Sequence, residues 1–320
     1  MKLHVLALDG VFDLGLACML DVFGTANELA ALQDPQAPPP FELALRGLRD
    51  TVRSAQGLQV PVEALRGDEQ PDWILLPALG CKLPQTLLPA LERPEVREAC
   101  AWLRQQHAQG ARVAAACIAG FVLAESGLLD GHAATTTWWL APLFRQRYLR
   151  VALDDSRLVL ESGPFVTSGA AMGHLDLSLW LLRQASPALA ALVARYLVVD
   201  ERPSQAPYVI PEHLAHADPL IARFEQWARA QLAQGFELQV AAAALAVSPR
   251  TLQRRCEAVL GKGPLAFVQD LRVQQAAHLL RSTRLDIEQI AAQVGYADGV
   301  SLRALLRRKL GRGVRELRGN

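Results

Sequence analysis

The first 200 residues alternate between short apolar runs and longer segments whose apolar residues recur at helical spacing. Apolar runs at 2–9, 41–46, 73–77 and 112–116 predict buried strands, while 16–32, 94–109 and 173–184 predict helices. Strands that alternate with helices form a parallel sheet covered on both faces. The pattern therefore predicts an N-terminal α/β domain with three layers.

The alternation stops at a segment without helical periodicity, and only helices are predicted after it. Residues 200–212 read DERPSQAPYVIPE and contain three prolines. Such composition is typical of a linker. We expect an N-terminal domain over 1–199, a linker over 200–215 and an all-helical C-terminal domain over 216–320.

The C-terminal part contains two successive helix-turn-helix patterns. In the first, an apolar helix at 240–246 is followed by Ser248, a good N-cap, and Pro249, which suits the first helical position. In the second, a helix at 287–294 ends at Gly295, and Asp298 can cap the next helix. Arginines cluster on the second helix of each pair. This layout is the one in which a recognition helix enters the major groove of DNA.

The distribution of charge supports this interpretation. The chain has a net charge of +1. From residue 216 on, however, there are 16 basic and 9 acidic residues, whereas the first 215 residues hold 17 basic and 23 acidic ones. A basic domain attached to an acidic one indicates a nucleic-acid-binding module joined to something else.

The last hundred residues resemble the AraC-type DNA-binding domain. The resemblance rests on the following residues: Ser248-Pro249-Arg250-Thr251-Leu252-Gln253-Arg254-Arg255, 261–265, Leu271-Arg272, 276–280, Ile287, Ile290-Ala291, Val294-Gly295-Tyr296 and Leu310-Gly311. Apolar Cys256, Leu302 and Leu306 replace aromatic residues usual in this family, at positions that should face the core. The resemblance implies double-stranded DNA, in a promoter or operator, as the partner.

The two second helices supply the expected DNA contacts. Base reading is expected from Arg250, Thr251, Gln253 and Arg254 in the first, and from Gly299, Val300, Arg303 and Ala304 in the second. Arg pairs with guanine and Gln with adenine, whereas the second set is poor in hydrogen-bonding groups and would read thymine methyls by van der Waals contact. Phosphate contacts are expected from Ser248, Arg255, Lys262, Arg307, Arg308 and Lys309.

The predicted strand 112–116 turns sharply into a helix at Cys117. A helix N-terminus lowers the pKa of a thiol, which would make Cys117 a plausible nucleophile. This segment, with 121–131, 134–138, 166–169 and 175–177, resembles the PfpI-like, class I glutamine amidotransferase-like superfamily, which has a flavodoxin-like fold. It is most similar to that domain as it occurs, fused to AraC-type domains, in GlxA-type transcriptional regulators.

Departures from the superfamily pattern argue against catalysis. Ile118 follows the cysteine where enzymes often carry histidine, and Thr137 stands where fused regulators often show one. The usual acidic residue of the first loop falls on Gly15, with Asp13 two residues earlier. A cysteine hydrolase needs a base within reach. We therefore expect a non-enzyme; a cysteine hydrolase or glyoxalase-like enzyme, a redox-sensing thiol and a small buried residue at a tight turn stay as alternatives for Cys117.

The carboxyl ends of parallel strands form the crevice in which such sheets bind ligands. The expected lining is Asp13, Ala78, Gly80, Cys117, Ile118, Thr135 and Ser168. A mostly neutral lining suits a small metabolite, of unknown identity, better than a polyphosphate. No cofactor and no metal is expected, since neither the histidines nor the five cysteines have ligand spacing.

The remaining expectations concern assembly and location. No uncharged apolar run of spanning length and no signal-peptide layout is evident, so no membrane is expected. The scattered cysteines fit a reducing cytoplasm, and DNA binding implies association with the nucleoid. A homodimer is expected, because two linked DNA-binding arms raise the effective concentration at a site.

Overall fold

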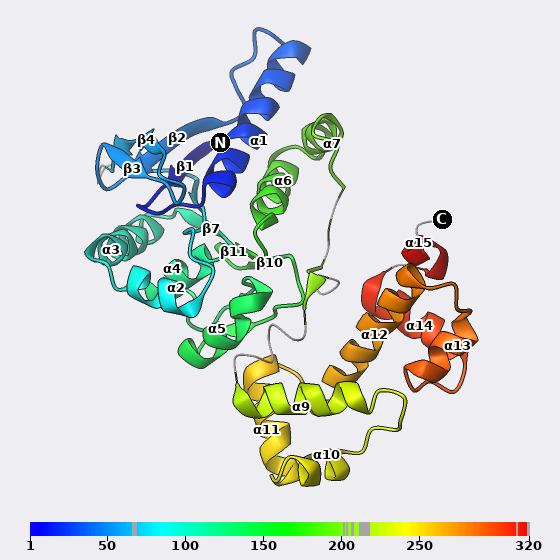
Figure 1. The fold of residues 1–320 in the computed structure, drawn as a ribbon. Helices are drawn as coiled ribbons and strands as arrows, with labels where there is room; N and C mark the ends of the chain where they lie inside the picture. The colour runs from blue at the N-terminus through cyan, green and yellow to red at the C-terminus, as the bar shows by residue number, and fades with distance from the viewer. Residues whose placement is uncertain are drawn as a thin grey trace. The chain divides into compact units, whose positions relative to one another are not determined.

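The computed structural model describes residues 1–65, 69–200, 202, 204–205, 208–210, 218–311 and 313–318 (Figure 1). The chain divides into two compact units, Met1–Gln205 and Ala206–Asn320. The division falls inside the range 200–215 that the sequence predicts as a linker. Of that range, residues 201, 203, 206–207 and 211–215 lie outside the described part.

A seven-stranded sheet in the order β10-β11-β7-β6-β1-β2-β5 forms the centre of the N-terminal unit. All neighbouring strands run parallel except β10 and β11. The strands are β1 (Lys2–Leu6), β2 (Glu42–Gly47), β5 (Glu63–Ala64), β6 (Trp73–Leu76), β7 (Arg112–Ala116), β10 (Val159–Ser162) and β11 (Phe165–Ser168). Two-stranded pairs are formed by β3 (Thr51–Arg53) with β4 (Gln59–Pro61) and by β8 (Ala133–Ala134) with β9 (Ala152–Leu153).

Helices cover both faces of this sheet, which confirms the three-layer α/β prediction (Figure 1). One layer contains α1 (Asp13–Gln33), α6 (Gly173–Ala185) and α7 (Pro187–Tyr196). The other contains α2 (Pro84–Leu91), α3 (Pro94–Ala108) and α4 (Ala119–Glu125). The 3₁₀ helix η1 (Trp138–Leu140) and α5 (Ala141–Arg147) follow β8.

Successive residues of each central strand pack into different cores. Ile74 and Val113 belong to the core beneath α2–α4, whereas their neighbours Leu75 and Ala114 belong to the core beneath α1, α6 and α7. Side chains alternate between the two faces of a strand, so a strand buried on both faces must be apolar throughout. This explains why the sequence shows continuous apolar runs.

Helix α1 is long enough and apolar enough to cross a membrane, judged by length and composition alone, and no other helix among the described residues is. Its residues Leu16, Met19, Val22 and Phe23 are buried in the core shared with α6 and α7. Burial against the sheet accounts for these four residues, whereas Leu14 and Leu32 of the same helix are exposed.

The C-terminal unit is helical. It contains α9 (Pro219–Ala230), α10 (Leu238–Ala244), α11 (Pro249–Leu260), α12 (Pro264–Ser282), α13 (Ile287–Gln293), α14 (Gly299–Leu310) and α15 (Val314–Arg318). The pairs α10–α11 and α13–α14 are the two predicted helix-turn-helix motifs. Ser248 caps α11 and Asp298 caps α14 through their side chains, and Gly295 has a φ of +77°. These local predictions are confirmed.

Helix α12 connects the two motifs through two charged side chains. Arg272 donates to the Gln234 carbonyl before α10, and its guanidinium lies 5.5 Å from the ring centroid of Tyr296 in the second motif. Asp270 accepts from Lys262, 3.0 Å away after α11, and from Lys309, 2.9 Å away at the end of α14. Both motifs are therefore fixed to one helix.

The apolar replacements of family aromatics are core residues, as expected. Cys256, Leu302 and Leu306 are fully buried. Leu302 and Leu306 pack with Ile290 and Val294 in the core of the second motif. Smaller apolar side chains thus preserve the packing at these positions.

Gly295→Ala should destabilise the C-terminal unit more than Gly311→Ala. Both glycines have positive φ, which costs an L-residue about 1–2 kcal/mol. A Cβ at Gly295 would also overlap the Leu232 carbonyl and the Arg272 guanidinium, whereas nothing lies within 4 Å at Gly311. Overpacking should add about 1–3 kcal/mol at Gly295 only. Chemical denaturation of the full-length variants, monitored through their helix content, measures the two free energies of unfolding. Equal losses of stability would contradict the tight packing around Gly295.

Candidate nucleic-acid interface and ligand site

The first turn of α11 is organised by its cap. The Ser248 hydroxyl accepts the Thr251 backbone N–H at 3.0 Å, and the two hydroxyls lie 2.8 Å apart. Pro249 occupies the first turn, where its missing N–H leaves no donor unsatisfied. The cap fixes the direction in which the following arginines leave the helix. Ser248, expected to contact phosphate, has this structural task as well.

The predicted base-reading side chains of α11 lie near the surface. Arg250 and Arg254 are exposed and form no ion pair within the described part of the chain. Thr251 and Gln253 are partly buried, and the Gln253 amide donates to Glu257 one turn later. Two unpaired guanidinium groups on the N-terminal half of a helix are suited to guanine edges or phosphates.

Helix α14 presents a mixed apolar and basic surface. Val300 is 68 % exposed, and Arg303 and Ala304 are exposed beside it. Arg307 and Arg308 are exposed in its last turns and lack ion-pair partners among the described residues. An exposed valine on a helix rich in arginine fits contact with a thymine methyl group.

Gly299 does not face the surface, which corrects one expected base contact. It is buried, its N–H donates to Glu288 at 2.7 Å, and a Cβ would lie 2.6 Å from the same carboxylate. The Glu288 side chain of α13 covers the position. The sequence pattern missed this because the contact joins the two helices of the motif.

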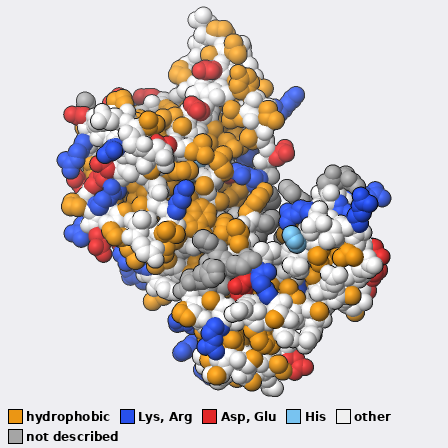
Figure 2. Space-filling model, viewed as in Figure 1, with side chains coloured by type: hydrophobic (Ala, Val, Ile, Leu, Met, Phe, Trp, Pro, Cys, Tyr) orange, Lys and Arg blue, Asp and Glu red, His pale blue; other side chains and the backbone are white. Residues whose placement is uncertain are grey.

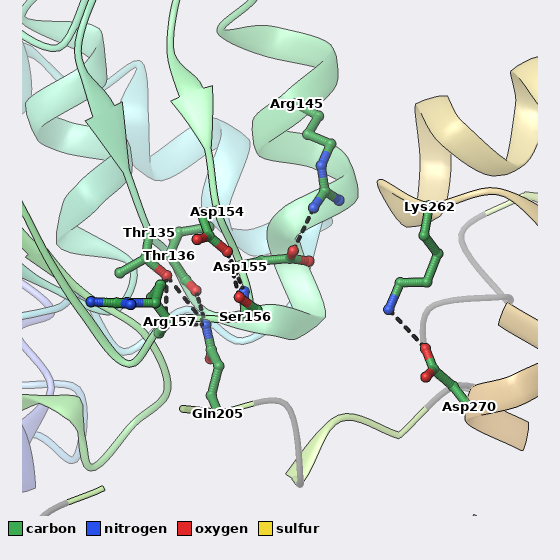
Figure 3. Close-up of polar contacts among 10 residues, drawn as sticks. All are labelled: Thr135, Thr136, Arg145, Asp154, Asp155, Ser156, Arg157, Gln205, Lys262 and Asp270. Atoms are coloured by element: carbon green, nitrogen blue, oxygen red, sulfur yellow. Dashed lines mark hydrogen bonds and ion pairs between the residues drawn. The ribbon is translucent and has the colours of Figure 1, made fainter. Parts of the chain in front are cut away.

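Three of the expected phosphate contacts are held in ion pairs inside the C-terminal unit. Arg255 pairs with Asp218, the N-cap of α9, and Lys309 pairs with Asp270. Lys262 pairs with Asp270 as well (Figure 3). These ion pairs stabilise the packing of helices in the free protein, and the expected phosphate contacts of the three cations stay predictions. On the face drawn in Figure 2, several groups of Lys and Arg side chains lie on the C-terminal unit, separated by apolar surface.

In the N-terminal unit, Cys117 occupies the sharp turn that the sequence predicts. Its φ is +56°, a conformation rare for a residue other than glycine. Its N–H donates to the Ser168 carbonyl at 2.7 Å, and its carbonyl accepts from the Thr136 hydroxyl at 3.2 Å. Thus the ends of β7 and β11 and the segment after β8 meet at this turn.

Burial determines the chemistry of the Cys117 thiol. The residue is only 3 % exposed, and desolvation raises its pKa to about 12, against smaller lowering effects of the Ile118 backbone and the Thr137 hydroxyl. The expectation that a helix N-terminus lowers this pKa is therefore wrong. The helix that follows is short, and the loss of water from the thiolate outweighs its dipole.

His174 fills the space beside Gly15, the position on which the sequence resemblance places an acidic residue. Its Nε2 accepts the Ala78 N–H at 3.0 Å and its Nδ1 donates to the Ala171 carbonyl at 2.7 Å. A Cβ at Gly15 would overlap the imidazole. Burial lowers the pKa of His174 to about 4, so the ring is neutral and its acceptor nitrogen is occupied. No local sequence pattern indicates this role of His174, because its contact with Ala78 joins segments far apart in the chain.

The other expected lining residues are mostly buried. Ala78, Ile118, Thr135 and Ser168 are inaccessible, whereas Asp13 and Gly80 are partly exposed. The Asp13 carboxylate accepts from the Ser54 hydroxyl and from the Gln56 N–H, and thus stabilises the loop after β3. A surface cavity of about 270 Å³ lies elsewhere, between α3, α4 and α5, lined by residues that include Cys100, Arg104, Glu125 and Arg147.

Cys117 should react slowly with thiol reagents. With a pKa of about 12, roughly one thiol in ten thousand is ionised at pH 8. Iodoacetamide at pH 8, followed by peptide mass spectrometry, should label the more accessible Cys81 well before Cys117. If Cys117 were labelled as fast as the thiol of a cysteine in a short unstructured peptide, the nucleophile and redox-sensor alternatives would be supported instead.

Comparisons with known proteins agree with this division of the chain. Residues 1–184 match the DJ-1/PfpI family and residues 241–320 match a helix-turn-helix domain. The HTH-type transcriptional regulator GbdR of Pseudomonas aeruginosa is 25 % identical over 295 residues, which cover 91 % of this chain and 77 % of that protein. The regulator GlxA of Rhizobium meliloti is 26 % identical over 213 residues, 61 % of each chain.

Solved structures show the same fold for the N-terminal unit. A crystal structure of an AraC family transcriptional regulator from Pseudomonas putida superposes with a TM-score of 0.51 and 18 % identity. It covers 61 % of this chain and 98 % of that one. Together with the family match over most of the N-terminal unit, this decides the assignment. The chain belongs to the DJ-1/PfpI family and carries a C-terminal helix-turn-helix domain of AraC type.

Proposed function

We propose that this protein is a sequence-specific DNA-binding transcriptional regulator of the cytoplasm, associated with the nucleoid. The observation that carries the proposal is the tandem of helix-turn-helix motifs fixed to α12, each with exposed arginines on its second helix that form no ion pair with another described residue. The relatives named as HTH-type transcriptional regulators support it. The two second helices would enter successive major grooves, about 34 Å apart.

The N-terminal unit serves, in this proposal, as a non-catalytic domain that senses a small metabolite and dimerises. The protonated Cys117 thiol and the occupied acceptor nitrogen of His174 speak against nucleophilic catalysis. Thr135 and Ser168 add neutral hydroxyls to the same region. The second candidate, a cysteine-dependent hydrolase, requires turnover that disappears in Cys117→Ser.

Selection of genomic DNA fragments by the purified full-length protein tests the function directly. A common site with two blocks about one helical turn apart is expected, because the two motifs sit on one helix. Affinity for the best fragment should fall as salt rises, since phosphate contacts release counterions. Binding that stays independent of sequence, with or without candidate metabolites, would contradict the proposal.

Arg254→Ala and Arg303→Ala should each relax preference at one base pair of the selected site. Loss of a bidentate contact to a base costs about 1–3 kcal/mol of discrimination at that position. Arg195→Ala, which removes an exposed charge from α7 of the N-terminal unit, is the charge-matched control. Competition binding with single-base variants of the site gives the measurement. A uniform loss over all variants would instead identify a phosphate contact.

The full-length protein should be a dimer at micromolar concentration. One tandem of motifs buries a limited DNA surface, and pairing two of them raises the effective concentration of the second arm. Light scattering coupled to size-exclusion chromatography measures the mass. A monomeric mass near 34.9 kDa would contradict dimerisation.

A further inference from the structure

The side chain of Gln205 is inserted into the N-terminal unit near the Cys117 turn. Gln205 is 1 % exposed although it is the last residue of that unit and directly precedes the C-terminal one. Its amide nitrogen lies 2.8 Å from the Thr136 carbonyl, 3.3 Å from the Arg157 carbonyl and 3.3 Å from the Thr135 hydroxyl (Figure 3). A polar side chain of a predicted linker therefore occupies a buried site.

Backbone and side-chain contacts hold the same segment against the unit. The Gln205 N–H and the Ser204 hydroxyl both donate to the Ser156 carbonyl, at 3.1 and 2.6 Å. Ser204 also forms an isolated antiparallel bridge with Arg157. Arg202 forms an ion pair with Asp176 of α6. The chain that leads to the DNA-binding unit is thus fastened at several points around the buried amide.

Gly169 leaves the space that the Gln205 amide fills. A Cβ at this position would overlap all three terminal atoms of the Gln205 side chain, although the φ of Gly169 is one that any residue can adopt. Gly169 directly follows β11, and its N–H donates to the Leu158 carbonyl at 2.8 Å. The absence of a side chain here is therefore a matter of space rather than of backbone conformation.

The three groups around the amide nitrogen define what the site recognises. All of them accept hydrogen bonds, and the Thr135 hydroxyl uses its proton on the Arg157 carbonyl at 2.9 Å. None of these partners is acidic, so a buried cation would lack a counterion. The site therefore favours a neutral N–H donor. The Gln205 Oε1 and the nearby buried Ser168 hydroxyl have no hydrogen-bond partner among the described residues, so Gln205 satisfies the region incompletely.

We propose that Thr135, Thr136 and Arg157 form a recognition site for a small effector that bears a primary carboxamide, and that Gln205 occupies this site as an internal ligand. An effector that satisfies the leftover polar groups displaces Gln205 and frees the segment before the DNA-binding unit. The displaced state differs in DNA affinity, because the segment is then no longer fastened. This inference rests on the proposed regulatory function.

Gln205→Ala tests the site by chemical rescue. The substitution deletes the atoms of one acetamide molecule and removes the donor that the Thr136 carbonyl, the Arg157 carbonyl and the Thr135 hydroxyl share. Acetamide should bind the variant, whereas acetate and N,N-dimethylacetamide, which lack N–H donors, should not. Hydrogen–deuterium exchange of peptides over 156–169 should rise in the variant and return to the wild-type rate with acetamide alone. Wild-type protein should need far more acetamide, since its tethered amide competes at high effective concentration.

Gly169→Ala is the matched second variant. Its added Cβ expels the Gln205 amide without removing it, so exchange over 156–169 should rise as in Gln205→Ala. Acetamide should not rescue it, because the Cβ occupies the position of the amide. Gln85→Ala, at an exposed glutamine of α2, should behave as wild type. The melting temperatures of all three variants are compared with that of the wild type, to show that each variant keeps its overall fold.

DNA binding distinguishes failure of this inference from failure of the proposed function. The affinity of Gln205→Ala for the fragment selected by the wild type should differ by about fivefold or more, and acetamide should reverse the change. If wild type and Gln205→Ala bind that fragment with equal affinity and show equal hydrogen–deuterium exchange over 156–169, the inference is wrong. The proposed function as a transcriptional regulator is unaffected by that result. Rescue by acetate to the same extent as by acetamide would also overturn it. If the wild type selects no site, the proposed function itself has failed.

Discussion

The geometry of the C-terminal unit depends on charged side chains of one helix, α12. Arg272 is buried, yet it reaches the Gln234 carbonyl on one side and the Tyr296 ring on the other. Asp270 binds Lys262, which directly follows the first motif, and Lys309, which lies in the second. Two small helix pairs joined by a flexible contact would have no fixed spacing. Anchored to α12, they have one, and fixed spacing is what reading of two successive grooves requires.

In the N-terminal unit, burial determines the chemical properties of the side chains near Cys117. The strand β7 is apolar on both faces, so its end at Cys117 is enclosed by the helices that cover the sheet. Desolvation then raises the pKa of the thiol, and the same enclosure keeps His174 neutral. A fold that positions a cysteine at a strained turn does not by itself make it reactive. What the enclosure leaves available near this turn is a set of neutral hydrogen-bonding groups.

Many elements could be predicted from the sequence because their signals are local. Ser248 and Asp298 cap helices, and Gly295 has positive φ, where short-range chemistry allows few alternatives. The continuous apolar strands indicated a parallel sheet for the same reason. By contrast, the pairing of Arg255 with Asp218 and the burial of Gly299 beneath Glu288 were missed. Each joins segments that no periodicity relates, so an arginine on a helix surface looks the same whether paired or unpaired.

The sequence by itself determined the fold class, the tandem motifs and the arginines on their second helices. Hydrophobic periodicity, helix caps and local charge depend only on residues that are close together in the chain. Only the tertiary structure decided which charges remain unpaired, what the Cys117 environment does to its pKa, and that the linker residue Gln205 enters the N-terminal unit. These properties depend on solvent exclusion and on distances between residues far apart in the chain, which exist only once the chain is folded.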